Sequence, residues 1–438
     1  MGKKVLKFGG SSLADANQFR RVAAIIKAEK DRRYVVASAP GKRFSDDEKV
    51  TDMLYACYNT AAGKGNIDEA IARVKERYDG IINDLGLNFS LDNEFEKIKM
   101  SISYGLAGRD YIASRGEYLN AMVLANYLGY DFIDAEGIIF FRENGEFDAE
   151  LTNDIMTRVL ANHERAVIPG FYGVMPNGTI KTFSRGGSDI TGSIVARAVK
   201  AEIYENWTDV SGMLMADPRL IKDPKPIELI TYKELRELSY MGATVLHEDA
   251  IFPVREAGIP INIRNTNIPE ASGTMIVSEI DNDTSAGLIT GIAGKKGFST
   301  ITVEKGQMNK TLFISEISHC MKHRNINIEH MPTGIDTISV VTSTESLKGK
   351  EGDVLASFDR HISPDSVTIT DGTALIAVVG RKMVKSKGIA ARIFRAVSAA
   401  DVNIRMIDQG SSELNIIIAV NEDDYVKALT AIYNEFDR

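Results

Sequence analysis

The chain has 438 residues, which is enough for about three domains of typical size. Its 44% hydrophobic and 26% charged residues are typical of folded globular proteins and exclude collagen-like and disordered classes. A net charge of −8, from 52 basic and 60 acidic residues, argues against nucleic acid or an anionic membrane as a partner, although a local basic pocket remains open.

The cysteines and the first residues of the chain indicate the cellular compartment. Cys57 and Cys320 are far apart and form no CxxC pair, so neither a disulfide framework nor a zinc ribbon is expected. The start, MGKKVLKFGG, lacks the apolar core of a secretory signal. No stretch reaches the roughly 20 apolar residues that span a bilayer. We therefore expect a cytoplasmic protein without a membrane partner.

The first part of the chain alternates short β-branched runs with helical patterns. In chain order these are VLKF, residues 17–30, YVVASA, residues 68–85, FIDA, RAVIPGF and AEIYENW. Such alternation favours a largely parallel α/β sheet with right-handed crossovers. Near 265–287 the pattern changes to runs rich in Asn, Ser, Thr, Asp and Gly, with one short apolar strand between them. We expect a first domain over residues 1–284.

The last part of the chain contains an internal repeat. Ile326–Ile328 recurs as Val402–Ile404, 76 residues later, and the same offset aligns the flanking elements. The first copy predicts the order β-α-β-β-α-β, from ITVE through a helix at 312–323, NIEHM, DTISVVTS and a helix at 347–358 to SVTIT. The second copy runs from ALIAVVG to a helix at 424–436 and is one strand short.

The strand LITGIA, from Leu288, precedes the first copy and has no evident partner. An unpaired apolar edge is prone to aggregate, so we expect this strand to complete the second copy. The first copy, residues 299–372, would then be inserted in a unit made of residues 285–298 and 373–438. A plain edge strand or linker is the alternative.

Two glycine-rich segments are candidates for binding an anion. In the first, VLKF runs into Gly9 and Gly10 before a helical pattern, so converging backbone N–H groups and a helix N-terminus could hold a phosphate. Lys7 would add positive charge there. A purely structural turn is the alternative.

The second segment is SRGGSD, residues 184–189, which also precedes a helical pattern. Arg185 could grip a planar carboxylate through two hydrogen bonds, and the glycines permit close approach of the backbone. Asp189 could orient a lysine or bind hydrated Mg²⁺, with a helix-start role as the alternative.

Further polar groups lie between and after these segments. Glu117, in SRGE, could pair with an ammonium group or form a solvated ion pair on a helix face. TDVSG from Thr208, followed by ADPR, lies where the carboxyl edge of a parallel sheet binds ligands, although a plain turn fits as well. The motifs GxxxxGK[ST], GxGxxG, HExxH and GxSxG are missing, which argues against a P-loop NTPase, a Rossmann dehydrogenase and a zinc peptidase.

The motifs together resemble a known family. KFGGSS, SRGE, SRGGSD, WTDVSG with ADPR, GATVLH and PINIRNTN occur in the order and at the spacing seen in aspartokinases, over nearly the whole chain. The repeat resembles paired ACT domains, with QGSSE at 409–413 similar to the second one. The resemblance implies an amino acid kinase fold with a largely parallel sheet, followed by two ferredoxin-like βαββαβ ACT domains, the first inserted in the second.

The resemblance also implies an activity. Aspartokinases phosphorylate the β-carboxylate of L-aspartate from ATP with Mg²⁺, giving 4-phospho-L-aspartate, the first step toward lysine, threonine and methionine. Phosphoryl transfer needs positioning and neutralised charge rather than a covalent nucleophile, which suits a lysine beside glycine-loop amides. No direct protein ligand for the metal is predicted.

Individual residues receive roles from the same resemblance. Lys7 would stabilise the transferring phosphoryl group and Asp189 would organise that lysine, while Arg185 and Glu117 would hold the carboxylate and the ammonium of aspartate. The implied ATP contacts are Lys7, Gly9, Gly10, Ser11, Thr208, Asp209, Leu214, Arg219, Thr244 and Val245. The implied aspartate contacts are Ser38, Ala39, Thr51, Glu117, Arg185, Gly187 and Ser188.

The chain departs from the family pattern at three places. The loop 40–49, PGKRFSDDEK, is longer and more charged than usual, and we expect it to be a mobile lid. Leu214 stands where many members have Tyr, and Thr244 stands where some have Lys. We expect these two changes to weaken contacts with the nucleotide.

The ACT pair implies feedback control by an amino acid bound between domains of a homodimer, with pairing into tetramers left open. Lysine is the expected effector, and threonine, or both together, is the alternative. Glu329 replaces the aspartate that pairs with the effector's amino group in lysine-sensitive relatives, and Met308 would lie on the opposite loop. A role in plain ACT core and surface is the alternative for this region.

Two other functions remain open on the sequence. Another amino acid kinase, of the glutamate or acetylglutamate type, shares the glycine-rich design, but the SRGGSD loop and the ACT pair argue against it. A non-catalytic amino-acid sensor would have lost turnover, and the intact Lys7, Arg185 and Asp189 argue against that. The length and the missing dinucleotide fingerprint predict a monofunctional enzyme, without a fused homoserine dehydrogenase.

Overall fold

The computed structural model describes residues 2–63, 65–184, 186–243, 246, 248–280, 287–306 and 309–437. The chain divides into two compact units. The first comprises Met1–Met213, Pro226–Tyr232 and Val245–Asn282, and the second comprises Leu214–Lys225, Lys233–Thr244 and Asp283–Arg438. Within the described ranges, no helix is long and apolar enough to cross a lipid bilayer.

The first unit is built on an eight-stranded sheet in the order β10-β12-β11-β7-β1-β2-β4-β3. Neighbouring strands are parallel except β11 and β12, which pair antiparallel. This arrangement confirms the predicted largely parallel α/β fold. The strands are β1 (Lys4–Phe8), β2 (Arg32–Ala37), β3 (Asp131–Phe132), β4 (Ala166–Pro169), β7 (Ile203–Thr208), β10 (Leu229–Thr231), β11 (Ile261–Asn265) and β12 (Thr274–Val277).

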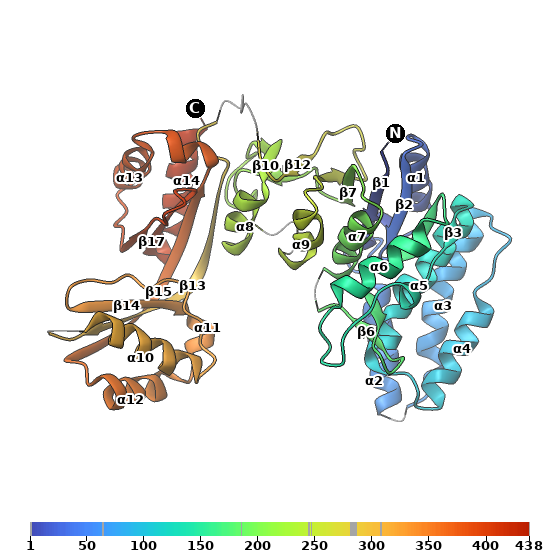
Figure 1. Cartoon of the computed structure of the whole chain (residues 1–438), viewed down its shortest axis with the longest axis horizontal. Helices are drawn as coiled ribbons and strands as arrows, with labels where there is room; N and C mark the ends of the chain where they lie inside the picture. Colours follow the sequence, from blue (N-terminus) through green and yellow to red (C-terminus); the bar gives the residue numbers. More distant parts are fainter. Residues whose placement is uncertain are drawn as a thin grey trace. The chain divides into compact units, whose positions relative to one another are not determined.

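Helices cover both faces of this sheet because its central strands are apolar on both sides. On one face, Leu6, Phe8 and Trp207 join a core shared with the first five helices, of which α3, α4 and α5 lie side by side (Figure 1). The opposite face packs against α7. The helices of the unit are α1 (Ala16–Lys27), α2 (Val50–Ala62), α3 (Asp68–Leu85), α4 (Asp92–Ser103), α5 (Arg109–Leu128), α6 (Ala149–Leu160), α7 (Gly187–Ala198) and α9 (Glu248–Glu256).

Shorter elements complete the part of the chain before residue 230. The hairpin of β5 (Tyr172–Val174) and β6 (Ile180–Thr182) is antiparallel. The short 3-10 turns and strands are η1 (Gly10–Leu13), η2 (Ala135–Gly137), β8 (Met213–Leu214) and β9 (Pro226–Ile227).

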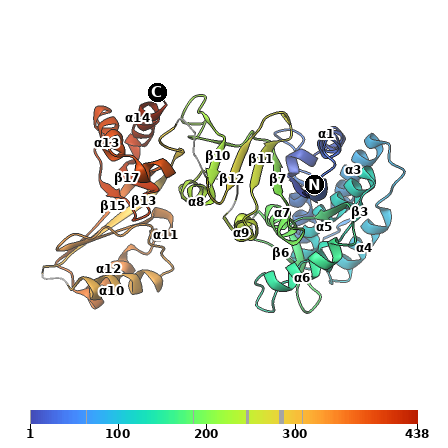
Figure 2. The ribbon, with the colours of Figure 1, turned by 45° about the horizontal axis from the view of Figure 1, so that its top comes forward.

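The second unit contains a five-stranded antiparallel sheet in the order β14-β13-β15-β17-β16. Figure 2 labels three of its strands, β13, β15 and β17. Two long strands run through it, and the register between them shifts after Lys295. Before the shift, β13 pairs with the second half of β15; beyond it, β13 pairs with both β14 and the first half of β15. The strands are β13 (Gly291–Glu304), β14 (Thr337–Ser343), β15 (Ser366–Val379), β16 (Met406–Asp408) and β17 (Asn415–Asn421).

Each half of this sheet has its own hydrophobic core. Ile301 and Val303 pack with α10 and α12, whereas Ile292 and Ile376 pack with α13 and α14. Ile289, from the apolar run that precedes the repeat, belongs to the core that contains α13 and α14. The helices are α8 (Tyr232–Tyr240), α10 (Lys310–Lys322), α11 (Thr344–Leu347), α12 (Glu351–Ile362), α13 (Ile389–Ala399) and α14 (Tyr425–Phe436), with 3-10 turns η3 (Arg381–Lys385) and η4 (Glu422–Asp424).

Two expected elements of the first repeat differ from the structure. NIEHM forms isolated bridges, such as His330 with Val341, rather than a regular strand, and the nearby Pro332 has no N–H to donate to a ladder. The single helix expected at 347–358 is two helices, α11 and α12. Gly349 lies between them with a φ of 77°, a left-handed conformation that interrupts a helix.

Candidate active site

Strand β1 places Lys7 against the start of helix α7. Lys7 Nζ and Asp189 Oδ1 are 2.6 Å apart, with the two side chains 10% and 16% exposed. Lys7 and Asn206 are register neighbours on β1 and β7, and Asn206 Nδ2 donates to the same Asp189 Oδ1 at 2.8 Å. One carboxylate oxygen therefore accepts from both an ammonium and an amide, which fixes where the lysine points.

Close packing holds Asp189 in place. It lies in the first turn of α7, whose N-terminal flanking residue, Gly186, has a left-handed φ of 58°. A Cβ on Gly187 would lie 2.6 Å from the Phe171 ring, so the helix can approach this closely with glycine there. Tyr204 Oη donates to the Asp189 carbonyl at 3.1 Å. The predicted Gly187 and the buried Ser188 thus lie in the same helical turn as Asp189.

The glycine segment after β1 is fixed by backbone contacts. Gly9 N donates to the Trp207 carbonyl at 3.0 Å, and residues 10–13, which include Gly10 and Ser11, form a 3-10 turn. The α-helix begins at Ala16, one residue before the expected start, because the Asp15 side chain accepts a hydrogen bond from the Gln18 N–H and starts the helix there. The segment's N–H groups are therefore separated from the helix N-terminus by one turn.

Ser38 and Ala39 follow the neighbouring strand, β2, and lie beside the glycine segment. Ser38 N donates to the Phe8 carbonyl at 3.2 Å, and Asn120 Nδ2 donates to the Ser38 carbonyl at 2.7 Å. Thr51 is the second residue of α2. The structure thus brings the predicted small-residue loop next to the segment that follows Lys7.

Glu117 is buried, 6% exposed, in the middle of α5. Burial raises its pKa to about 8, although backbone hydrogen bonds from Ala39 and from Glu117 itself act in the opposite direction. Its Oε2 has no hydrogen-bond partner among the described residues. The alternative of a solvated surface ion pair is therefore wrong for this residue, because desolvation rather than solvent sets its charge state.

Thr208 and Asp209 lie at the carboxyl end of β7, where Thr208 Oγ1 donates to Asp209 Oδ1 at 3.2 Å. Leu214 and Arg219 belong to the second unit, in which Arg219 pairs with Asp217 at 2.6 Å. Glu329, also in the second unit, accepts a hydrogen bond from the Tyr240 hydroxyl. The predicted site residues outside the described ranges are Arg185, Thr244, Val245 and Met308.

The charged loop 40–49 is held by ion pairs, which differs from the expected mobile lid. Arg43 Nε and Arg77 Nη1 contact Asp47 Oδ2 at 2.8 and 2.7 Å, and Arg73 pairs with Glu48 at 2.8 Å. The Arg43 hydrogen bond is the largest cause that holds the pKa of Asp47 well below its usual range. The charged side chains of this loop thus hold it in place. Composition alone does not show whether a charged loop is anchored or mobile.

Asn206 is the residue nearest the ion pair that sequence analysis missed. A signal was present: a polar amide within the strand-like run AEIYENW, two residues from Tyr204 and hence on the same face of the strand. Its pairing with Lys7 across the sheet depends on strand register, which the sequence did not give.

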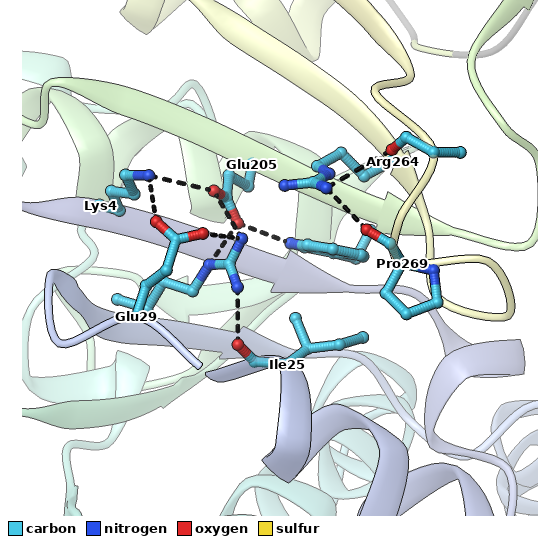
Figure 3. A network of polar contacts seen from close by, with 9 residues as sticks. Lys4, Ile25, Glu29, Glu205, Arg264 and Pro269 are labelled. Atoms are coloured by element: carbon cyan, nitrogen blue, oxygen red, sulfur yellow. Dashed lines mark hydrogen bonds and ion pairs between the residues drawn. The ribbon is translucent and has the colours of Figure 1, made fainter. Parts of the chain in front are cut away.

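A buried charge network lies on the other face of the same strands (Figure 3). Arg32 Nε contacts Glu205 Oε2 at 3.0 Å, and both side chains are at most 4% exposed. Trp207 Nε1 donates to the same oxygen at 2.9 Å, while Lys4 Nζ pairs with Glu29 at 2.5 Å and approaches Glu205 to 3.8 Å. This network joins β7 to β2 across β1, the strand that carries Lys7.

Comparisons with known sequences identify the family. The amino acid kinase family model matches residues 2–265, and an ACT domain model matches residues 376–436. Aspartokinase 3 of Bacillus subtilis (strain 168) is 38% identical, over 99% of this chain and 98% of its own length. The chloroplastic aspartokinase 1 of Arabidopsis thaliana is 27% identical, over 99% of this chain and 80% of its own length.

Solved structures agree with the sequence relatives. The Clostridium acetobutylicum aspartate kinase is 48% identical, with a TM-score of 0.91 over 100% of both chains. E. coli aspartokinase III, 22% identical with a TM-score of 0.76 over 100% of both chains, shares the fold. The chain shares the family's motifs, a family model matches more than half of it, and relatives align along its whole length. The chain therefore belongs to the aspartokinase family, the amino acid kinases that carry ACT domains.

Proposed function

We propose that the chain transfers the γ-phosphoryl group of ATP to the β-carboxylate of L-aspartate, giving 4-phospho-L-aspartate and ADP. The observation that carries this proposal is the Lys7–Asp189 contact of 2.6 Å beside the glycine segment. The E. coli relative was solved with aspartate and ADP, the acceptor and the spent donor of this reaction.

The donor side of the proposal begins at Lys7. An ammonium oriented by Asp189 and Asn206 would face the charge that develops on the transferring phosphoryl group, as phosphoryl transfer requires. Magnesium enters as part of the substrate, Mg-ATP, and neutralises the phosphates. The remaining proposed ATP contacts are Gly9, Gly10, Ser11, Thr208, Asp209, Leu214, Arg219, Thr244 and Val245.

On the acceptor side, Glu117 is proposed to bind the ammonium of aspartate. A bound cation would give the unpartnered Oε2 a partner and would favour the ionised carboxylate that burial disfavours. Arg185 is proposed to hold the carboxylate. The remaining proposed contacts are Ser38, Ala39, Thr51, Gly187 and Ser188.

Regulation and domain organisation complete the proposal. The domains would be residues 1–284 for the kinase, 299–372 for the first ACT domain and 285–298 with 373–438 for the second. The separate cores of the two sheet halves, and the early part of β13 packed in the second core, support the insertion. L-Lysine would inhibit through the ACT domains of a homodimer, at the first step of lysine, threonine and methionine synthesis. E. coli aspartokinase III in complex with lysine and aspartate supports this choice of effector.

The test measures ADP formation from Mg-ATP, with hydroxylamine trapping of the acyl phosphate, for L-aspartate and L-glutamate in parallel. We expect aspartate to give a trapped product, and we expect lysine to suppress its formation. Product with glutamate alone would favour a different amino acid kinase, and no product with either would favour an amino-acid sensor. Inhibition by threonine alone would correct the effector.

A further inference from the structure

Arg77, on helix α3, joins two loops that belong to different parts of the proposed site. It is buried, 7% exposed. Its Nη2 donates to the Gly41 carbonyl at 2.7 Å and to the Ala14 carbonyl at 3.1 Å. Its Nη1 contacts Asp47 Oδ2 at 2.7 Å. One guanidinium therefore contacts the segment after β1 and, at two points, the loop after β2.

The two loops also touch each other directly through their backbones. Gly41 N donates to the Gly10 carbonyl at 2.8 Å. A Cβ on Gly10 would lie 2.8 Å from the Ala39 carbonyl oxygen, and a Cβ on Gly41 would lie 2.6 Å from the Gly10 carbonyl carbon. Glycine is therefore needed on both sides of this contact. Any shift of one loop must move the other.

Contacts within the loop 40–49 fix the position of the Asp47 carboxylate, which pairs with Arg77. Its carboxylate accepts from the Arg43 backbone N–H at 2.9 Å and from Arg43 Nε at 2.8 Å, and the side chain is 8% exposed. The loop closes where Val50 N donates to the Pro40 carbonyl at 3.1 Å, immediately before Thr51. The loop is thus a closed unit with one buried attachment point on α3.

We propose that Arg77 is a positioning residue that holds the acceptor loop, residues 38–51, against the donor loop, residues 9–14, at the separation that phosphoryl transfer requires. The inference rests on the proposed function, which assigns ATP to the donor loop and aspartate to the acceptor loop. A guanidinium suits this task because its rigid fork can serve several acceptors at once, whereas a lysine offers one point charge. Misplacement of reacting groups by about 1 Å lowers rates on the order of 10²-fold.

The chain offers a matched control on the same helix. Arg73, one turn before Arg77, also pairs with the loop, through Glu48 at 2.8 Å, but its side chain is 59% exposed. We compare Arg77→Met, Arg77→Lys and Arg73→Met in the full chain. Arg77→Met should lower kcat by about 10- to 100-fold while KM for ATP and aspartate changes by less than about threefold. Arg77→Lys should remain impaired because it restores the charge without the fork, and Arg73→Met should behave like the wild type.

Amide hydrogen exchange supplies a readout that does not depend on activity. Arg77→Met should speed exchange in residues 9–14 and 40–50 together, and Arg73→Met should not. If Arg77→Met fails to fold, Asp47→Asn, which keeps the side-chain shape, takes its place in both measurements. An active wild type with unchanged kcat and unchanged exchange in these variants would overturn the inference and leave the function standing. If the wild type is inactive but Arg77→Met still loses protection in both loops together, the function is overturned and the coupling of the loops is supported.

Discussion

At the scale of single residues, Lys7 is the side chain whose loss should matter most to turnover. Lys7→Ala removes the cation that faces the glycine segment, and we expect kcat to fall by at least about 10²-fold. Lys3→Ala is the matched control, since Lys3 lies over the Tyr34 ring and outside the site. Circular dichroism and initial rates of both variants check the prediction. Near-normal turnover of a folded Lys7→Ala would refute the catalytic assignment.

Glu117 gives a prediction about pH. Its pKa of about 8 means that it is largely protonated at neutral pH, so binding an ammonium there must first release a proton. We expect KM for aspartate to fall by about tenfold per pH unit as the pH rises toward 8 and then to level off. Glu117→Gln should weaken aspartate binding and remove this dependence. A wild-type KM that is constant from pH 6 to pH 8 would contradict the role.

The same shift affects stability. The folded-state pKa of Glu117 lies above the ordinary value of 4.5, so the folded protein holds the proton more tightly than the unfolded chain. Its contribution to stability is therefore complete below pH 4.5 and is lost as the pH rises toward 8. Thermal melts should accordingly show the wild type losing stability relative to Glu117→Gln, which cannot ionise, as the pH rises from 5 to 8.

At the scale of elements, the close approach of helix α7 to the rest of the site depends on glycine. Gly187→Ala would place a methyl group 2.6 Å from the Phe171 ring and 2.9 Å from the Phe171 Cα, so the helix start must shift. We expect a lower melting temperature and reduced turnover, because Asp189 would move with the helix. Gly80→Ala, in the exposed middle of α3 with open space around it, should instead stabilise the protein by about 0.5–1 kcal/mol. Equal effects of the two changes would contradict the argument.

The buried network across β7, β1 and β2 gives a second element-scale prediction. Arg32→Met leaves the Glu205 carboxylate in a 2% exposed position without its main partner, which should cost about 3–5 kcal/mol of unfolding free energy. The double variant Arg32→Met with Glu205→Met should recover part of that loss, because no uncompensated charge remains there. Urea unfolding of the two variants checks this. A double variant less stable than Arg32→Met would contradict this argument and show that Glu205 stabilises the sheet through Lys4 and Trp207 even without Arg32.

At the scale of the whole molecule, the proposed inhibition by lysine depends on residues of the second unit. Glu329 accepts from the Tyr240 hydroxyl, so an effector ammonium that pairs with Glu329 competes with this hydrogen bond. Glu329→Gln should weaken lysine inhibition by about tenfold or more while leaving the rate without lysine unchanged. Tyr240→Phe should strengthen inhibition by freeing the carboxylate. Lysine and threonine titrations of initial rate measure both effects, and an unchanged lysine response in Glu329→Gln would locate the effector elsewhere.

Much of this architecture follows from local sequence pattern. The apolar runs VLKF and YVVASA become β1 and β2, and the order of the motifs along the chain already indicates the family. Glycine and polar runs mark the segments that follow these strands, because backbone freedom and hydrogen-bonding capacity are local properties of residues. Periodicity therefore predicts the parallel α/β sheet and the segment that contains Lys7.

Only the tertiary structure decided which side chains meet. Asn206 contacts Asp189 because strand register places it beside Lys7, and Arg77 reaches Ala14 and Gly41 from a helix far along the chain. Glu117 acquires its raised pKa from burial, and the charged loop 40–49 proves anchored rather than a free lid. These properties arise from contacts between residues distant in sequence and from the dielectric environment that packing creates, and neither is encoded in composition or periodicity.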